Sequence, residues 1–343
     1  MTAFDLDRYS RQTRFPPLGA EGQAKLAAAR VVIVGCGALG SASAVALARA
    51  GVGSLRLIDR DLPEPSNLPR QLLFDEADAA EPLPKVVAAA RHLARINSAT
   101  RVEPMVADLV SANAVDLLAD VDVIVDGTDN LEARYLINEV ACRTATPWVH
   151  GAAVGGEGRV LTVLPGRTAC LRCLVPDLPP PGALPTCETA GILGPAAMVV
   201  GAVQATEAIK LIVAAAADTA GRMLAFDLWS GDWRTLDLAP LAAAGCPTCR
   251  AGDAPWLEGQ LGAPATELCG RDAVHVPAAA GGRVDLSALA DRLAAVGPVT
   301  VNEWMLRADV EPGVRLSVFA DGRVIVTGTR DQARARSLVA RYL

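Results

Sequence analysis

A glycine-rich segment near the N-terminus has the spacing of a phosphate-binding loop. Gly35, Gly37 and Gly40 satisfy G-x-G-x-x-G and follow an apolar run over residues 30–35. Glycines at these positions permit a tight turn and let backbone N–H groups at a helix N-terminus approach a phosphate. Asp59 ends the next predicted strand, where a carboxylate can accept hydrogen bonds from ribose hydroxyls. The motif predicts a nucleotide site, and taken alone it favours an NAD-dependent oxidoreductase.

Charged residues beyond this loop change the expected nucleotide. Arg70 lies in a polar segment over residues 66–71, Lys85 opens a predicted helix, and Asp129 follows a later predicted strand directly. Each has an alternative explanation, because Arg70 and Lys85 could be solvated surface charges and Asp129 could cap the following helix. Considered together, the two cations could neutralise a triphosphate, and Asp129 could hold Mg²⁺ or orient a reacting carboxylate. The set therefore predicts one polyphosphate site.

Two cysteine pairs have the spacing of metal half-sites. Cys170 and Cys173 form the first C-x-x-C pair, and Cys246 and Cys249 form the second. Four thiolates can surround Zn²⁺ tetrahedrally and leave no coordination position open, so a structural zinc is expected. The alternative is a redox-active C-x-x-C, but nothing near either pair resembles a thioredoxin-like context.

A further cysteine, Cys187, could act as a nucleophile. It follows a proline-rich segment over residues 176–185 and precedes a helix predicted to begin near Gly194. A thiol on a loop can attack an activated acyl group, and a nearby helix N-terminus would lower its pKa. The residues alone leave two alternatives open for Cys187: a catalytic thiol and an inert one.

The elements that must position these groups alternate between strand and helix. Because strands separated by helices form βαβ units, the pattern predicts an α/β fold with a doubly wound, mostly parallel sheet. The predicted strands cover residues 30–35, 55–59, 102–106 and 121–126, and the predicted helices cover residues 40–50, 85–97 and 131–145.

The C-terminal part has a different pattern. We expect a first domain over residues 1–252 and a small α+β module over residues 257–343 whose role the sequence does not indicate. The module is expected to contain a helix at 285–296, a strand at 299–307, a β-hairpin at 315–327 and a final helix at 331–342.

Composition excludes several classes of function. The chain has 32 basic and 38 acidic residues, and a net charge of −6 argues against a general nucleic-acid or anionic-membrane binder. The N-terminus is acidic and has no apolar run, which favours a cytoplasmic protein without a signal peptide. Gln204, Glu207 and Lys210 interrupt the most apolar stretch, so we expect it to be a buried or interface helix and not a membrane span.

With these motifs in place, the sequence resembles the ThiF/MoeB adenylyltransferases, which are bacterial relatives of ubiquitin-activating enzymes. The resemblance covers roughly residues 5–250. It rests on the following residues: Arg8-Tyr9-Ser10-Arg11-Gln12, the three loop glycines, Asp59, Ser66-Asn67, Arg70-Gln71, Lys85, Thr128-Asp129-Asn130, both cysteine pairs, and Thr186-Cys187 with Ala190-Gly191.

The resemblance implies adenylation of a protein substrate. Such enzymes use MgATP to adenylate the C-terminal Gly-Gly carboxylate of a small ubiquitin-like, β-grasp sulfur carrier in molybdopterin, thiamine or thiolation pathways. It further implies a role for each matching residue: ribose binding by Asp59, triphosphate binding by Asn67, Arg70 and Lys85, a position at Mg²⁺ and the carboxylate for Asp129 and Asn130, and acyl transfer for Cys187.

Three expectations qualify this resemblance. Arg11 is implied to reach the γ-phosphate bound by a neighbouring subunit, which predicts a homodimer. Residues 76–84 form a longer stretch before Lys85 than the family pattern has, and a displaced Lys85 would weaken catalysis. The alternative functions are a non-catalytic scaffold that binds the carrier and, less favoured, the oxidoreductase, which leaves Arg70, Lys85, Asp129 and the cysteine pairs without a role.

Overall fold

The chain forms two compact units in the computed structural model, which describes residues 7–179, 185–187, 189–213, 221–242, 245–261, 272–276 and 284–343. The first unit comprises Met1–Ala79 and Pro84–Leu261, and the second comprises Ala80–Leu83 and Gly262–Leu343. Trp256 and Leu257 are buried in the core of the first unit. The short segment Ala80–Leu83, from the first half of the chain, belongs to the C-terminal unit.

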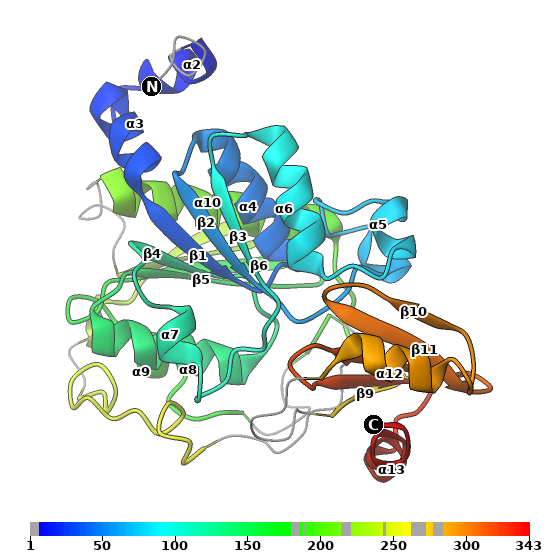
Figure 1. Ribbon diagram of the computed structural model, residues 1–343. Helices are drawn as coiled ribbons and strands as arrows, with labels where there is room; N and C mark the ends of the chain where they lie inside the picture. The colour runs from blue at the N-terminus through cyan, green and yellow to red at the C-terminus, as the bar shows by residue number, and fades with distance from the viewer. Residues whose placement is uncertain are drawn as a thin grey trace. The chain divides into compact units, whose positions relative to one another are not determined.

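The first unit is built on a mixed sheet (Figure 1). Among the described residues, eight strands follow the order β3-β2-β1-β4-β5-β6-β7-β8. The pairs from β3 to β5 are parallel, and those from β5 to β8 are antiparallel. The strands are β1 (Arg30–Val34), β2 (Ser54–Ile58), β3 (Arg101–Met105), β4 (Val123–Asp126), β5 (Trp148–Val154), β6 (Glu157–Val163), β7 (Arg222–Asp227) and β8 (Asp232–Asp237).

Helices cover both faces of this sheet. In Figure 1, α4, α6 and α10 lie over one face, and α7, α8 and α9 lie over the other. Because both faces are covered, β1 and β4 are apolar and buried almost throughout, as central parallel strands must be. The predicted doubly wound α/β fold is confirmed. The helices are α2 (Ser10–Thr13), α3 (Gly19–Ala28), α4 (Ala38–Ala50), η1 (Pro65–Asn67), α5 (Glu76–Ala80), α6 (Lys85–Ile96), α7 (Ala114–Leu117), α8 (Leu131–Thr144), α9 (Leu171–Leu174), α10 (Gly194–Val213) and α11 (Ala239–Ala242).

Within the described part of the chain, α10 is the one helix long and apolar enough to cross a membrane by length and composition.

Helix α10 packs tightly on α4 and on β5. Gly201 brings it close to α4, since a Cβ there would lie 2.6 Å from that of Ala42. Gly151 of β5 likewise leaves room for Gln204, whose Nε2 would lie 2.4 Å from an added Cβ. This glycine explains why sequence reasoning missed β5, because glycine normally weakens a strand pattern.

The second unit contains a five-stranded antiparallel sheet in its described residues, in the order β10-β11-β12-β13-β9. The expected single strand over residues 299–307 is wrong, because a turn at Asn302 divides it into β10 and β11. The expected hairpin and both expected helices are present. The elements are β9 (Ala273–Val276), α12 (Leu286–Leu293), β10 (Val299–Val301), β11 (Met305–Glu311), β12 (Val314–Phe319), β13 (Val324–Thr327) and α13 (Gln332–Tyr342).

Candidate active site

An open cavity lies where β1, β2 and β4 end. The carboxyl ends of parallel strands share one edge of a sheet, and ligands of doubly wound proteins bind in the crevice beyond it. Residues far apart in the sequence meet there. Eight of the expected site residues line the cavity: Gly35, Gly37, Asp59, Arg70, Lys85, Asp129, Asn130 and Cys187.

The glycine loop joins β1 to α4, and each of its glycines has a distinct steric role. Gly35 has a positive φ of 86°, and a Cβ there would lie 2.7 Å from the carbonyl oxygen of Gly127. Gly40 does not line the cavity but lies inside α4, where a Cβ would overlap the Gly35 carbonyl. Gly37 is the N-cap of α4 and has open space around it. The loop is therefore shaped so that an anion can approach the backbone at the N-terminus of α4.

Asp59 and Lys85 both line the cavity, and Asp61 contacts each of them. The Asp59 carboxylate accepts the N–H groups of Cys36 and Asp61, both at 2.7 Å. A carboxylate has about four acceptor sites, so Asp59 can still accept ribose hydroxyls. Burial raises the pKa of Asp59, and the nearby Lys85 ammonium opposes that effect.

Lys85 is not a solvated surface charge. It is only 4% exposed, and its Nζ lies 3.3 Å from Asp61 Oδ2. Its backbone N–H donates to the carbonyl of Asp61 at 2.8 Å, so the first residue of α6 is held on the end of β2. Lys85 lines the cavity, so the stretch before it, which we expected to be longer than in the family, has not displaced it.

Arg70 and Asn67 come from the turn after the second strand. Arg70 lines the cavity and donates to the carbonyl of Ser66 at 2.7 Å, which fixes its guanidinium beside the turn. Asn67 is buried and does not line the cavity. Its Oδ1 has no hydrogen-bond partner among the described residues, so a donor from outside those residues could still reach it.

Asp129 is not used to cap α8. The side chain of Asn130 accepts the N–H of Glu132 at 2.9 Å and is the N-cap of that helix. Asp129 lines the cavity with an exposed side chain. The helix-capping alternative for Asp129 is therefore wrong, and the carboxylate remains available for chemistry.

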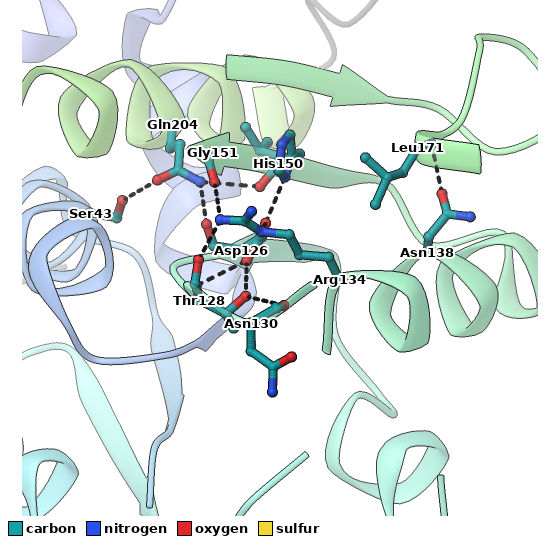
Figure 2. A network of polar contacts seen from close by, with 11 residues as sticks. Ser43, Asp126, Thr128, Asn130, Arg134, Asn138, His150, Gly151, Leu171 and Gln204 are labelled. Atoms are coloured by element: carbon teal, nitrogen blue, oxygen red, sulfur yellow. Dashed lines mark hydrogen bonds and ion pairs between the residues drawn. The ribbon is translucent and has the colours of Figure 1, made fainter. Parts of the chain in front are cut away.

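A buried polar network holds the loop that carries Asp129 (Figure 2). Asp126, at the end of β4, accepts the backbone N–H and the hydroxyl of Thr128 at 2.9 and 2.8 Å. Its other oxygen lies 3.2 Å from Arg134 Nε and 2.7 Å from His150 Nδ1. Arg134 in turn donates to the carbonyl of Thr128 at 2.6 Å. Asp126 and Arg134 thus clamp the backbone of Thr128 from both sides.

Helix α10 closes this network from the opposite side. The Nε2 group of Gln204 donates to the backbone carbonyls of Asp126 at 2.6 Å and Val149 at 3.3 Å. Its Oε1 accepts the hydroxyl of Ser43 at 3.4 Å. Sequence reasoning did not assign these roles. The available signal was a charged residue ending the fully buried strand β4, followed one helical turn into α8 by an arginine.

Burial and the neighbouring charges together determine the protonation states of this network. Burial alone would raise the pKa of Asp126, but the Arg134 charge and the His150 hydrogen bond outweigh it and hold that pKa below its usual value. Burial lowers the pKa of His150, and Arg134 adds to this effect against the pull of Asp126. The network therefore contains an ionised Asp126, a charged Arg134 and a neutral His150 at neutral pH.

Cys187 lines the cavity, but its environment differs from the expected one. Its Sγ lies 3.6 Å from the carbonyl oxygen of Ala153. Burial raises the pKa of the thiol and the Asp129 charge adds to it, with Arg70 acting in the opposite direction. The expectation that a helix N-terminus would lower this pKa is wrong, because Cys187 is half-buried beside a carboxylate.

Arg11 is the one expected catalytic residue that lies away from the cavity in the described chain. It is exposed on the short helix α2 and is not among the residues that line the cavity. The structure therefore does not bring Arg11 together with the other expected catalytic residues.

The four paired cysteines form one cluster in the first unit. The Sγ of Cys170 lies 3.8 Å from those of Cys173 and Cys246, and the Sγ of Cys173 lies 3.6 Å from that of Cys249. Four sulfurs placed tetrahedrally at Zn–S distances of about 2.3 Å are separated by about 3.8 Å, so the cluster fits zinc. A hydrogen bond with Cys142 lowers the pKa of Cys170, and donation by Asn138 adds to this. Both favour the thiolate, which is the ligand form.

The protein has a doubly wound α/β fold, and its cavity at the strand ends is lined by a glycine loop, cations and carboxylates, which is typical of nucleotide-binding proteins of this class. The ThiF family pattern matches residues 9–248, and the chain belongs to this family. The sulfur carrier protein ThiS adenylyltransferase of Bacillus subtilis is 41% identical over 98% of this chain and 99% of its own. The SAMP-activating enzyme E1 of Haloferax volcanii is 38% identical over 75% of this chain and 94% of its own. Among solved structures, E. coli MccB matches the fold with a TM-score of 0.62 at 24% identity, over 71% of this chain and 72% of that one.

Proposed function

We propose that this protein is an adenylyltransferase that uses ATP to activate the C-terminal carboxylate of a small ubiquitin-like sulfur carrier protein. The observation that carries the proposal is the cavity, where the glycine loop, Asp59, Arg70, Lys85 and Asp129 converge. The ThiS adenylyltransferase that matches almost the whole chain supports the substrate class.

In the proposed reaction a carboxylate oxygen of the carrier forms a bond to the α-phosphorus of ATP. The bond from that phosphorus to its bridging oxygen breaks, and pyrophosphate leaves. Both reactants are anionic, so catalysis depends on positioning and on neutralising charge. Lys85 and Arg70 neutralise the phosphates, Asp59 holds the ribose, and the backbone of Gly37 approaches the phosphates from the N-terminus of α4.

Asp129 has the chemistry to hold Mg²⁺. Its carboxylate faces the cavity, and Mg²⁺ is usually bound by one or two carboxylates together with substrate phosphates. Bound there, the cation would neutralise phosphate charge. The network of Asp126 and Arg134 keeps the Asp129 loop in position for this role, and Asn130 fixes its end by capping α8.

The cysteine cluster is proposed to hold a structural Zn²⁺. With four protein ligands no coordination position remains for a substrate, so the metal would stabilise the region between α9 and the turn at Cys246. Free thiols at this spacing also support a cytoplasmic location, where cysteines stay reduced.

We propose further that the enzyme is a homodimer in which Arg11 acts on the triphosphate bound by the other subunit. Its exposed position outside its own cavity supports this arrangement. The test is complementation between two inactive variants, Arg11→Ala and Asp129→Ala. A mixed dimer contains one complete site, so mixing should restore activity, whereas two subunits with independent sites would stay inactive.

The test of the function is ATP–pyrophosphate exchange with ThiS-like and MoaD-like carriers, each with and without its terminal glycine. Exchange that requires the intact carrier terminus, and that Asp129→Ala abolishes in folded protein, is the expected result. Normal exchange by the Asp129 variant would refute the proposed site. ATP binding without exchange for any carrier would favour the non-catalytic scaffold, and hydride transfer from NADH would favour the oxidoreductase.

A further inference from the structure

Two polar side chains of the first unit, Asn138 and Arg172, contact the cysteine pairs. Asn138 belongs to α8 and is fully buried, and Arg172 lies between the two cysteines of the first pair. Neither an amide nor a guanidinium is a usual zinc ligand, so an effect of either residue on the metal must act through the cysteines. Sequence reasoning gave no role to either residue.

Asn138 binds two adjacent residues of the first pair with its two side-chain atoms. Its Nδ2 donates to the Sγ of Cys170 at 3.6 Å. Its Oδ1 accepts the N–H of Leu171 at 3.0 Å, as Figure 2 shows. Asn138 and Cys170 are both fully buried, so water does not compete for these bonds. Because both ends of the amide are used, the Cys170 sulfur is held in one orientation relative to α8.

Arg172 joins the first cysteine pair to the second. It is the third residue of the first C-x-x-C sequence, and Thr248 is the third residue of the second. The Nη1 group of Arg172 donates to the Oγ1 of Thr248 at 3.0 Å and to the Oδ2 of Asp253 at 3.1 Å. The N–H of Asp253 in turn donates to the carbonyl of Pro247 at 2.9 Å, which places Asp253 in the same turn as the second pair. The guanidinium therefore grips this turn at two points.

Both contacts meet a requirement of a site built from four thiolates. Such a site binds one ion only if the sulfurs from both pairs stay at fixed positions, and the thiolates carry excess negative charge that an N–H donor stabilises. The Arg172 charge is paired with Asp253, so its contribution is the connection between the pairs more than its net charge. Side chains that hold metal ligands in this way typically change metal affinity by about 10- to 100-fold.

We propose that Asn138 and Arg172 are positioning residues for the metal site. Asn138 orients Cys170, and Arg172 holds the second pair at the distance from the first at which four sulfurs can bind one ion. This inference rests on the proposed Zn²⁺ in the cysteine cluster and does not depend on the proposed adenylation.

The test uses the full-length protein with Asn138→Asp and with Arg172→Met. Asn138→Asp keeps the acceptor for Leu171 but replaces the donor to Cys170 with an oxygen that repels the thiolate. Arg172→Met keeps an aliphatic side chain and removes the donor to Thr248. Zinc affinity, measured by competition with a chromogenic chelator, should fall about 10- to 100-fold in Asn138→Asp and about 10-fold in Arg172→Met.

Two matched variants control for a general loss of stability. Asn113 uses its side chain as Asn138 does, since its Oδ1 accepts the N–H of Val110 at 2.9 Å and its Nδ2 donates to the carbonyl of Asp108 at 2.8 Å. Arg56 is a partly buried arginine that donates to two backbone carbonyls, both at 3.0 Å. Asn113→Asp and Arg56→Met should lower the melting temperature and leave the zinc affinity as in the wild type.

Co²⁺ bound in place of zinc supplies a second measurement. Its visible absorption reports the type and geometry of the ligands. The absorption bands of folded Asn138→Asp should differ from those of the wild type, whereas those of Asn113→Asp should not. If Asn138 only stabilised the fold, its variant would melt earlier with an unchanged spectrum.

The outcomes separate this inference from the proposed metal. If the wild-type protein binds neither Zn²⁺ nor Co²⁺, the proposed metal fails and the inference fails with it. If the wild type binds zinc and either folded variant, Asn138→Asp or Arg172→Met, binds it as tightly, the inference is wrong and the proposed metal stands. If Asn138→Asp does not fold, Arg172→Met decides by the same criterion. An equal loss of affinity in Asn113→Asp or Arg56→Met would show general instability and would also overturn the inference.

Discussion

Replacing Asp126 with Asn should cost this enzyme both stability and activity, because the carboxylate is a buried counter-charge and also holds the loop of Asp129. Asp126 is fully buried, and its partner Arg134 is 12% exposed at the side chain, so Asp126→Asn leaves a largely buried guanidinium without a counter-charge. Breaking a buried ion pair on one side costs about 3–5 kcal/mol. At a few degrees per kcal/mol, the melting temperature should fall by roughly 10 °C.

The same change loosens the clamp on Thr128, because an amide cannot accept from Thr128 and from both Arg134 and His150. A displacement of about 1 Å at a reacting group can cost about 100-fold in rate, so exchange should fall by about that factor at 25 °C, where the variant is still folded. Circular dichroism would verify folding, and pyrophosphate exchange would measure the rate.

Asp122→Asn is the matched control, since it removes a carboxylate just before the same strand. Asp122 is exposed and accepts the N–H of Arg30 at 2.7 Å, so its loss should cost about 1 kcal/mol and leave the rate unchanged. A rate for Asp126→Asn within two-fold of the wild type, despite a lower melting temperature, would refute the argument that the network positions Asp129.

Three further predictions follow from groups with defined surroundings. The pKa of His150 is lowered in the folded protein, so below the ordinary histidine pKa of about 6.5 the unfolded chain binds more protons than the folded chain. The contribution of His150 to stability is therefore fully present above that pH and falls as the pH drops toward 5. A melting temperature that stays constant over this range, or an equally steep fall in His150→Asn, would contradict this. Removal of zinc by a chelator, or Cys246→Ser, should lower the melting temperature and reduce activity only as the protein unfolds, and an unchanged melting curve in both cases would refute a structural metal. Labelling of Cys187 by iodoacetamide, followed by mass spectrometry, should rise with pH around a midpoint above the ordinary value of 9.0 because burial and Asp129 raise its pKa; a midpoint below that value would show that the thiol is activated.

Much of the site could be predicted from local sequence because its residues lie at fixed positions relative to parallel strands. A strand that runs into glycines, a carboxylate that ends the next strand and Asp129 after β4 must all reach the same edge of one sheet. The alternation of apolar strands and amphipathic helices likewise predicted the parallel half of the sheet. These features depend on periodicity and chain order, which a single sequence contains.

The features that were missed depend on contacts between distant segments. The strand β5 contains Gly151, which weakens its strand pattern, and the reason for that glycine is the side chain of Gln204 on α10. The turn that divides β10 from β11 depends on how Asn302 uses its two side-chain atoms. The raised pKa of Cys187 depends on burial beside Asp129, which the nearby helix start in the sequence did not indicate.

The sequence by itself determined which groups are available for chemistry in this protein: a glycine loop after a strand, two cations, carboxylates that follow strand ends and four cysteines in two pairs. Residue type and spacing are enough for that, because the fold brings strand ends together in a known order. The tertiary structure decided which groups are held and which are available. It assigned helix capping to Asn130 and left Asp129 facing the cavity, and it set Asp126, Arg134 and His150 behind the loop. Burial and hydrogen-bond partners fix those assignments, and both arise only when elements distant in sequence pack against one another.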